Sequence, residues 1–210
     1  MITVFLADDH QLFREGLRHL LQKHGGYQVV GEAETSTDAI RMILSLKPEI
    51  ALVDLDMPGV GGLEAARLIH SRLSSVKILI VSGQSEEHFA VRCLKAGASG
   101  FLHKRSAAKE LVQALETIRK GGKYVSPDAA THLVLSATGG GEGPAHAKLS
   151  DREMDVMLRV AKGQSSSDIA SALNLSVKTV STYRRRISDK LDLHSAADIV
   201  RYALTNGLID

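Results

Sequence analysis

The chain contains a single cysteine, Cys93, so it has no disulfide framework. Its apolar runs fall well short of the roughly 18 residues of a membrane span, and we expect no membrane partner. The amino-terminus lacks a basic segment with a cleavage site, which predicts no signal peptide and a cytoplasmic location. The formal net charge of +2 is too small to indicate any partner. Function therefore has to be argued from local patterns.

The composition, 44% hydrophobic and 24% charged, is that of a globular protein. A length of 210 residues is sufficient for two domains. Residues 1–120 alternate between strand and helix patterns. Strand-like runs occur at Ile2–Ala7, Tyr27–Ala33, Ile50–Asp54, Lys77–Ser82 and Gly100–His103. Helical periodicity occurs at Gln11–His24, around Ala39–Leu44, and at Gly61–Leu73, Glu86–Ala96 and Lys109–Arg119. This alternation predicts an α/β fold with a doubly wound, five-stranded parallel sheet.

The alternation stops in residues 121–146, which we predict to be a linker. A short helix is expected over Ala129–Leu135, followed by a flexible glycine-rich stretch. Residues 147–210 then have the pattern of a small all-α domain of four helices. Serine-led starts predict these helices, at Ser150, Ser165, Ser176 and about Ser195. The third helix, Val177–Leu191, is basic and follows a tight turn, which is typical of a DNA-binding helix-turn-helix.

Polar side chains stand at the ends of four of the expected strands. Asp8 and Asp9 follow the first strand, Asp54 ends the third, Ser82 ends the fourth and Lys104 follows the fifth. The carboxyl ends of parallel strands meet at one edge of a sheet, where open α/β sheets place their ligands. Three acids close together need a cation, and a lysine beside them needs an anion. A divalent metal with a phosphoryl group satisfies both requirements.

A carboxylate at a strand end can attack phosphorus and form an aspartyl-phosphate. The reaction needs a metal to neutralise the charge of the phosphoryl group. Mg²⁺ prefers oxygen ligands, and Asp8, Asp9 and the main-chain carbonyl of Asp56 could supply them. Lys104 could hold the phosphoryl oxygens as a point charge, and Ser82 could donate a hydrogen bond to the same group.

Residues 1–120 resemble the receiver domain of response regulators, which has the CheY-like fold. The matching segments are Leu6–His10, Asp54–Gly59, Val81–Gly83 and Gly100–Lys104. The resemblance implies that Asp54 accepts a phosphoryl group from a sensor histidine kinase. It also implies that Asp8, Asp9, Asp54 and the Asp56 main chain bind Mg²⁺, and that Ser82, Lys104 and the switch aromatic Phe101 respond to phosphorylation. A receiver is not an enzyme, except that it assists its own phosphorylation and dephosphorylation. His103 replaces the usual aliphatic residue, and we expect it to face the surface or a partner.

Residues 147–210 resemble the LuxR-type helix-turn-helix domain, through Leu149–Glu153, Ser167–Ala170, Leu175–Val180 and Lys190-Leu191. Together the two resemblances imply a transcription regulator of the NarL/FixJ family that binds double-stranded DNA. Helical spacing selects Ser181, Thr182 and Arg185 as candidates for contacts with base edges. Candidates for phosphate contacts are Lys178, Thr179, Tyr183, Arg184, Arg186 and Lys190. Activation is expected to give a homodimer on two half-sites, with RNA polymerase as a candidate further partner.

Two other interpretations remain open at this point. Asp54-Leu55-Asp56 also matches the paired aspartates of haloacid-dehalogenase-type phosphohydrolases, although there the pair normally follows the first strand of the sheet. Alternatively, the chain is a DNA-binding regulator whose receiver is never phosphorylated and serves as a dimerisation module. The completeness of the acidic pocket argues against this second alternative.

Overall fold

The computed structural model divides into two compact units, Met1–Thr131 and His132–Asp210, which are described separately. The described residues are 1–84, 86–127, 129–131, 144–173 and 175–209. Among them, no helix combines the length and the apolar character that crossing a membrane requires.

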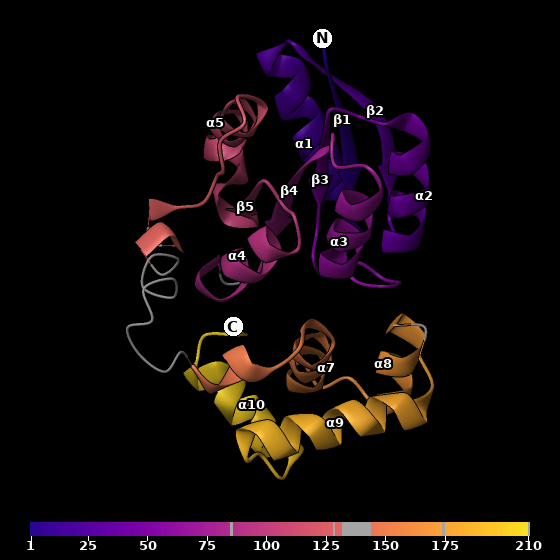
Figure 1. The fold of residues 1–210 in the computed structure, drawn as a ribbon, viewed down its shortest axis with the longest axis vertical. Coiled ribbons are helices and arrows are strands. Elements are labelled where there is room, and N and C mark those ends of the chain that lie inside the picture. The colour runs from indigo at the N-terminus through magenta and orange to yellow at the C-terminus, as the bar shows by residue number, and fades with distance from the viewer. Residues whose placement is uncertain (85, 128, 132–143, 174, 210) are drawn as a thin grey trace. The chain divides into compact units, whose positions relative to one another are not determined.

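The first unit is built on a parallel sheet with the strand order β2-β1-β3-β4-β5, which confirms the predicted doubly wound fold (Figure 1). The strands are β1 (Ile2–Ala7), β2 (Tyr27–Ala33), β3 (Ile50–Val53), β4 (Lys77–Ser82) and β5 (Gly100–His103). β3 ends one residue earlier than predicted, so Asp54 directly follows it. The chain runs outward from β1 to β2 and then crosses back to β3. The carboxyl ends of β1 and β3 therefore form the switch point at which such sheets bind ligands.

Helices cover both faces of this sheet (Figure 1). They are α1 (Gln11–His24), α2 (Ser36–Leu46), α3 (Gly62–Arg72), α4 (Glu86–Lys95) and α5 (Ala107–Arg119). α1 packs against α5, while α2 packs against α3 and α3 against α4. The ends of α1, α3, α4 and α5 lie within two residues of the predicted segments, and α2 contains the residues Ala39–Leu44 that were predicted to be helical.

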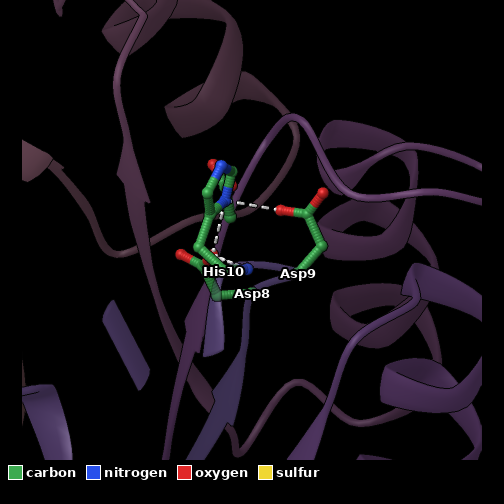
Figure 2. A group of neighbouring side chains, drawn as sticks. Asp8, Asp9 and His10 are labelled. Carbon is green, nitrogen blue, oxygen red and sulfur yellow. Dashed lines mark hydrogen bonds and ion pairs between the residues drawn. The ribbon is translucent and has the colours of Figure 1, made fainter. Parts of the chain in front are cut away.

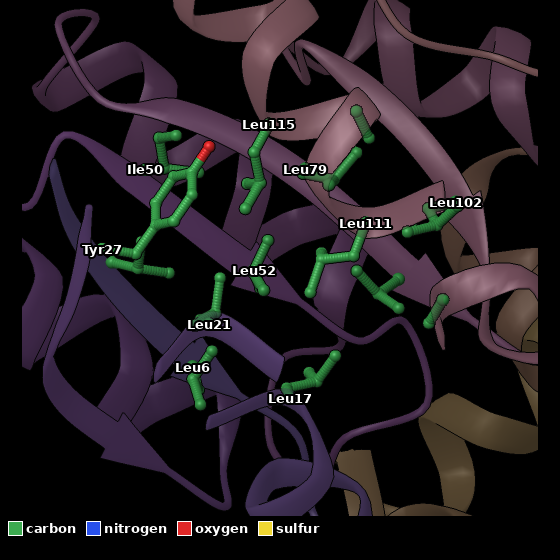
Figure 3. Packing of buried hydrophobic residues seen from close by; sticks show 14 of the residues in the cluster. Leu6, Leu17, Leu21, Tyr27, Ile50, Leu52, Leu79, Leu102, Leu111 and Leu115 are labelled. Carbon is green, nitrogen blue, oxygen red and sulfur yellow. The ribbon is translucent and has the colours of Figure 1, made fainter. Parts of the chain in front are cut away.

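A leucine-rich cluster between α1, α5 and the sheet forms one core of this unit (Figure 3). Leu17 and Leu21 enter it from α1 and Leu111 and Leu115 from α5, at the helical spacing that keeps such pairs on one face. The strands contribute Val4, Leu6, Ile50, Leu52, Leu79, Val81 and Leu102. Each fully buried leucine contributes roughly 1.5–3 kcal/mol relative to its exposed state. This cluster fixes the strand ends from which the polar residues project.

The chain after α5 returns to the sheet instead of leaving it directly. Tyr124 forms a parallel bridge with Gly100, and its carbonyl accepts a hydrogen bond from the amide of Phe101 at 2.8 Å. The Tyr124 hydroxyl donates to Glu110 on α5 at 2.8 Å. Residues 121–131 thus group with the first unit. Of the short helix expected over Ala129–Leu135, residues 129–131 are helical and the rest lie outside the described residues, as do residues 138–143 of the glycine-rich stretch.

The second unit is helical, as predicted. Its helices are α7 (Asp151–Ala161), α8 (Ser166–Leu173), α9 (Val177–Leu191) and α10 (Ala196–Thr205). The predicted capping box at Ser150 and Glu153 is present, and Ser195 begins a second one. α7 packs against α9 and α10, and α8 packs against α9. The core of this unit includes Val156, Met157, Ile169, Val180, Ile187 and Ile199.

Gly62 brings the start of α3 against the end of β3. A methyl group built on Gly62 would overlap the main-chain carbonyl oxygen of Asp54, and the Gly62 amide donates to Leu55 at 3.1 Å. The loop that carries Asp54 can therefore fold back on α3 only because residue 62 has no side chain.

We predict that Gly62→Ala lowers the free energy of unfolding by about 1–3 kcal/mol, because the added methyl group forces the backbone to shift. Gly16→Ala is a matched control in the interior of α1, where an added Cβ meets no atom within 4 Å. That substitution should raise stability by about 0.5–1 kcal/mol through its better helix propensity. Urea unfolding followed by circular dichroism measures both changes, and equal effects would contradict the close approach at Gly62.

Candidate functional site

Lys104 joins two buried carboxylates at the carboxyl edge of the sheet. Its Nζ lies 2.7 Å from Asp8 Oδ2 and 2.8 Å from Asp54 Oδ2. The Asp8 side chain is 4% exposed and that of Asp54 1%. The convergence of these three residues, predicted from their strand-end positions, is thus present in the structure.

Asp54 is the most constrained group of the pocket. Burial raises the pKa of its carboxyl to about 6, Lys104 opposes this increase, and the nearby carboxylates of Asp8 and Asp56 add to it. Its Oδ1 atom is buried and has no hydrogen-bond partner. Burial works to lower the pKa of Lys104, but Asp54 and Asp8 outweigh it and raise that pKa above its ordinary value. A buried carboxylate oxygen without a partner is costly, so this atom is suited to bind an additional group.

Asp9 and His10 continue the pocket toward solvent. Figure 2 shows His10 Nδ1 joined to both neighbouring acids, at 2.7 Å from Asp9 Oδ1 and 3.2 Å from Asp8 Oδ1. One donor atom from each of Asp8, Asp9, His10 and Asp54 lies within 4.8 Å of the others, a spacing that could hold a metal ion. Sequence reasoning assigned no role to His10, although its position directly after the paired acids was a signal that it could belong to the site.

Arg14 holds the main chain of the acidic loop at Asp8 in place, and sequence reasoning assigned it no role. It is a buried arginine on α1 whose Nη1 donates to the main-chain carbonyl of Asp8 at 2.6 Å. Its Nη2 donates to Glu34 at 2.6 Å and its Nε lies 3.4 Å from Glu32. These bonds tie the end of β1 to the end of β2. A single arginine in a helix gives no local sign of such a role.

Ser82 and Asp56 are linked through Gln84. The Gln84 amide donates to Ser82 Oγ at 3.2 Å, and its side-chain nitrogen lies 2.8 Å from Asp56 Oδ2. Ser82 is fully buried and Gln84 nearly so. The Asp56 carboxylate thus binds Gln84, which leaves its main-chain carbonyl as the group predicted for a metal.

The remaining candidates of the first unit lie on or beside β5. Phe101 is fully buried within the sheet. His103 is half-buried, and its Nδ1 accepts the amide of Arg105 at 3.1 Å at the start of the short helix Lys104–Ser106. The Lys104 ammonium also lies 4.8 Å from the centre of the Phe13 ring, a favourable cation–π contact.

The α9 helix of the second unit presents an exposed face. Val180 and Ile187 are buried, while Lys178, Ser181, Thr182 and Arg185 are exposed, as their spacing predicted. The Arg185 side chain is 84% exposed. Ser176 caps the helix by accepting the amide of Thr179 at 3.0 Å. Such a face, with a basic residue at its centre, could enter a groove of DNA.

Other candidates on α9 hold the helices of this unit together. Lys190 Nζ lies 2.6 Å from Glu153 Oε2 and donates to the Lys148 carbonyl at 3.3 Å. Arg184 donates to Ser166 on α8 at 3.2 Å. Tyr183 is half-buried, and the Arg186 guanidinium lies 6.0 Å from the centre of its ring. The basic character of α9 therefore serves both packing and the exposed face.

Comparison with known proteins matches both units to described families. Residues 4–116 match the response regulator receiver domain, and residues 147–203 match the luxR family of bacterial regulatory proteins. The response regulator UvrY of Escherichia coli is 39% identical over 210 residues, covering 99% of this chain and 96% of its own. The chain belongs to the NarL/FixJ family of response regulators.

Solved structures of the RcsB response regulator support this family assignment. A Salmonella typhimurium RcsB structure, described in terms of conformational dynamism for DNA interaction, superposes with a TM-score of 0.78 at 26% identity. It covers 99% of this response regulator and 98% of that chain. RcsB bound to the rprA promoter in the presence of the phosphomimetic BeF₃⁻ gives a TM-score of 0.70 at 27% identity, covering 96% of this chain and 97% of that one.

The receiver should lose stability as Asp54 ionises in metal-free buffer. Because the pKa is about 6 in the folded state against an ordinary 3.8, the folded receiver binds more protons between these values, and stability falls as pH rises through this window. Relative to Asp54→Asn, the loss should approach at most about 3 kcal/mol.

Denaturant unfolding of both proteins at a series of pH values, with a chelator present, measures this difference. The Asp54→Asn variant serves as the control for the wild type, because the two proteins share every other titrating group. Parallel stability curves would contradict the raised pKa of Asp54.

Proposed function

We propose that this response regulator is a phosphorylation-controlled transcription regulator in which Asp54 accepts a phosphoryl group from a sensor histidine kinase. The observation that carries the proposal is the Asp54 carboxylate itself. One of its oxygens is bound by Lys104 at 2.8 Å, while the other is buried without a hydrogen-bond partner. A nucleophile needs a lone pair that no hydrogen bond occupies and a nearby cation that offsets the charge of the incoming group.

Mg²⁺ is the proposed cofactor, and the donor atoms of the pocket fit it. Asp8, Asp9 and Asp54 offer carboxylate oxygens within 4.8 Å of one another, and the Asp56 main-chain carbonyl is the fourth proposed ligand. Hard oxygen donors are the ligands that Mg²⁺ prefers. The ion would neutralise charge that Lys104 alone cannot balance against two buried acids.

Ser82, Lys104 and Phe101 are the proposed reporters of phosphorylation. Phosphorylation adds roughly −1.5 to −2 charge at Asp54. Lys104 is already at hydrogen-bonding distance of Asp54, whereas the Ser82 hydroxyl accepts the Gln84 amide and would donate its own proton to the phosphoryl group. The proposed result is a change in the surface formed by β4, β5 and their helices, which includes Phe101 on β5.

DNA recognition is assigned to the exposed face of α9. Ser181, Thr182 and Arg185 are the proposed contacts to base edges. The proposed phosphate contacts are Lys178, Thr179, Tyr183, Arg184, Arg186 and Lys190, of which Arg184 and Lys190 also bind neighbouring helices. The promoter complex of RcsB, at 27% identity, supports a role in binding double-stranded DNA.

The proposed organisation is a receiver over residues 1–120, a linker over 121–146 and the DNA-binding domain over 147–210. Phosphorylation would favour a homodimer on two half-sites, in the cytoplasm and with access to RNA polymerase. On this proposal the protein turns over no substrate apart from the phosphoryl group on its own Asp54.

We predict that Asp54→Asn abolishes labelling by acetyl phosphate in Mg²⁺, because the amide is a poor nucleophile. Wild-type protein should take up one acid-stable phosphoryl group, measured by intact mass. Asp192→Asn, at an exposed position in the second unit, should label normally. Stoichiometric acid-stable label on Asp54→Asn would overturn the assignment of the acceptor.

A wild-type protein that shows no change in oligomeric state or DNA affinity with beryllofluoride and Mg²⁺ would favour the phosphorylation-independent alternative.

Arg185→Ala should relax base preference by about 1–3 kcal/mol, because an arginine on the exposed face can bind guanine through two hydrogen bonds. Arg186→Ala should weaken binding to all sequences and flatten the salt dependence by about one unit of slope. Fluorescence anisotropy with matched and mismatched duplexes at several salt concentrations separates these effects. Identical behaviour of the two variants would show that the assignment of Arg185 to base edges and of Arg186 to phosphates is wrong.

A further inference from the structure

We propose that Phe13 is a positioning residue whose aromatic face holds the Lys104 ammonium where it can bind the phosphoryl group. The inference rests on the proposed function, in which Lys104 binds the phosphoryl oxygens on Asp54, and adds to it a residue without an assigned role. A lysine ammonium over an aromatic ring is attracted by the negative charge of the ring face within about 6 Å of its centre. Lys104 Nζ lies 4.8 Å from the centre of the Phe13 ring.

The Lys104 ammonium contacts groups of two kinds. Two are carboxylates, since its Nζ lies 2.7 Å from Asp8 Oδ2 and 2.8 Å from Asp54 Oδ2, and the third is the uncharged ring of Phe13. The proposed function changes both carboxylates, because Asp8 binds Mg²⁺ and Asp54 becomes an acyl phosphate. The ring takes part in neither step. Phe13 is therefore the contact that can stay with Lys104 while the ion pairs of Lys104 are exchanged for a phosphoryl oxygen.

Helix α1 fixes the position of the ring. Phe13 lies in the first turn of α1, where its amide donates to the His10 carbonyl at 3.1 Å. Its side chain is half-buried and packs against the leucine-rich cluster between α1, α5 and the sheet. The next residue, Arg14, donates to the main-chain carbonyl of Asp8, so the turn that carries the ring is tied to the pocket. A side chain held on a packed helix presents its face in a defined place, which a positioning role requires.

The surroundings of Lys104 strengthen this contact. The Lys104 side chain is only 19% exposed, so water competes little for its ammonium group. Cation–π contacts are stronger when the cation is desolvated, and the loss of one corresponds to about a 2- to 30-fold change in an equilibrium or a rate. The competing explanation is that Phe13 only fills space beside the cluster. Packing depends on the shape of the ring, whereas the cation–π contact depends on the charge of its face.

The test changes the charge of the ring face at nearly constant shape. Mono-, di- and trifluorinated phenylalanine replace Phe13 in the full-length protein, because each fluorine withdraws electrons and makes the ring face less negative. The readout is the rate of labelling of Asp54 by acetyl phosphate at saturating Mg²⁺, followed by intact mass. An Asp54 oxygen bonds to phosphorus while the bond from phosphorus to the acetyl oxygen breaks, and acetate leaves with the electron pair.

The rate should fall stepwise along the fluorinated series, by about threefold or more in total. The Mg²⁺ affinity should not fall, because the ring offers no ligand to the ion. Phe13→Leu should be at least as slow as the trifluorinated protein, and should lose the ring-current shift of the Lys104 ε-methylene protons in the NMR spectrum. Leu20→Ala is the matched control, since Leu20 is also half-buried on α1 and packs against the same cluster. It should lower stability and leave the labelling rate unchanged.

Equal rates along the fluorinated series would overturn the inference. So would a parallel loss of Mg²⁺ affinity, which would indicate a disturbed pocket. If the wild type takes up no phosphoryl group, the proposed function fails and the inference fails with it. If the wild type is labelled and the fluorinated proteins are labelled equally fast, only the role of Phe13 fails.

Discussion

The receiver pocket depends on an imbalance of buried charge, in which two carboxylates share one ammonium group. Asp8 and Asp54 are almost fully buried, and Lys104 contacts one oxygen of each. Burial raises the pKa of Asp54 to about 6; Lys104 opposes this increase only in part, and the carboxylates of Asp8 and Asp56 add to it. The strand order and the missing side chain of Gly62 both keep these groups at the switch point of the sheet. The proposed Mg²⁺ would relieve this imbalance of charge.

The fold could be predicted from the sequence because its periodicities are strong and local. Alternating strand and helix patterns defined all five strands of the sheet, and the convergence of Asp8, Asp54 and Lys104 followed from parallel strands ending at one edge. The return of Tyr124 to the edge of β5 could not be predicted. It depends on a close approach at Gly100, where a side chain would collide with the Tyr124 carbonyl, and no local pattern encodes that contact.

Within the candidate site, sequence reasoning identified the groups at strand ends and missed those that act across loops. Gln84 binds Asp56 over a separation of 28 residues, so its role depends on tertiary structure alone. On α9, helical spacing correctly separated the buried and exposed faces. It could not show that Lys190 binds Glu153, because that partner lies on another helix.

The buried Arg14 makes the two sides of the pocket unequal in stiffness. On the β1 side, the Arg14 guanidinium donates a charged hydrogen bond to the Asp8 main chain. The same guanidinium forms ion pairs with Glu32 and Glu34 at the end of β2. On the β4 side, Ser82 is held by a single neutral amide from Gln84. Charge-assisted bonds are roughly twice as strong as neutral ones. If Asp54 is phosphorylated as proposed, this difference in anchoring favours a rearrangement on the β4 side of the pocket over one at the anchored Asp8 main chain.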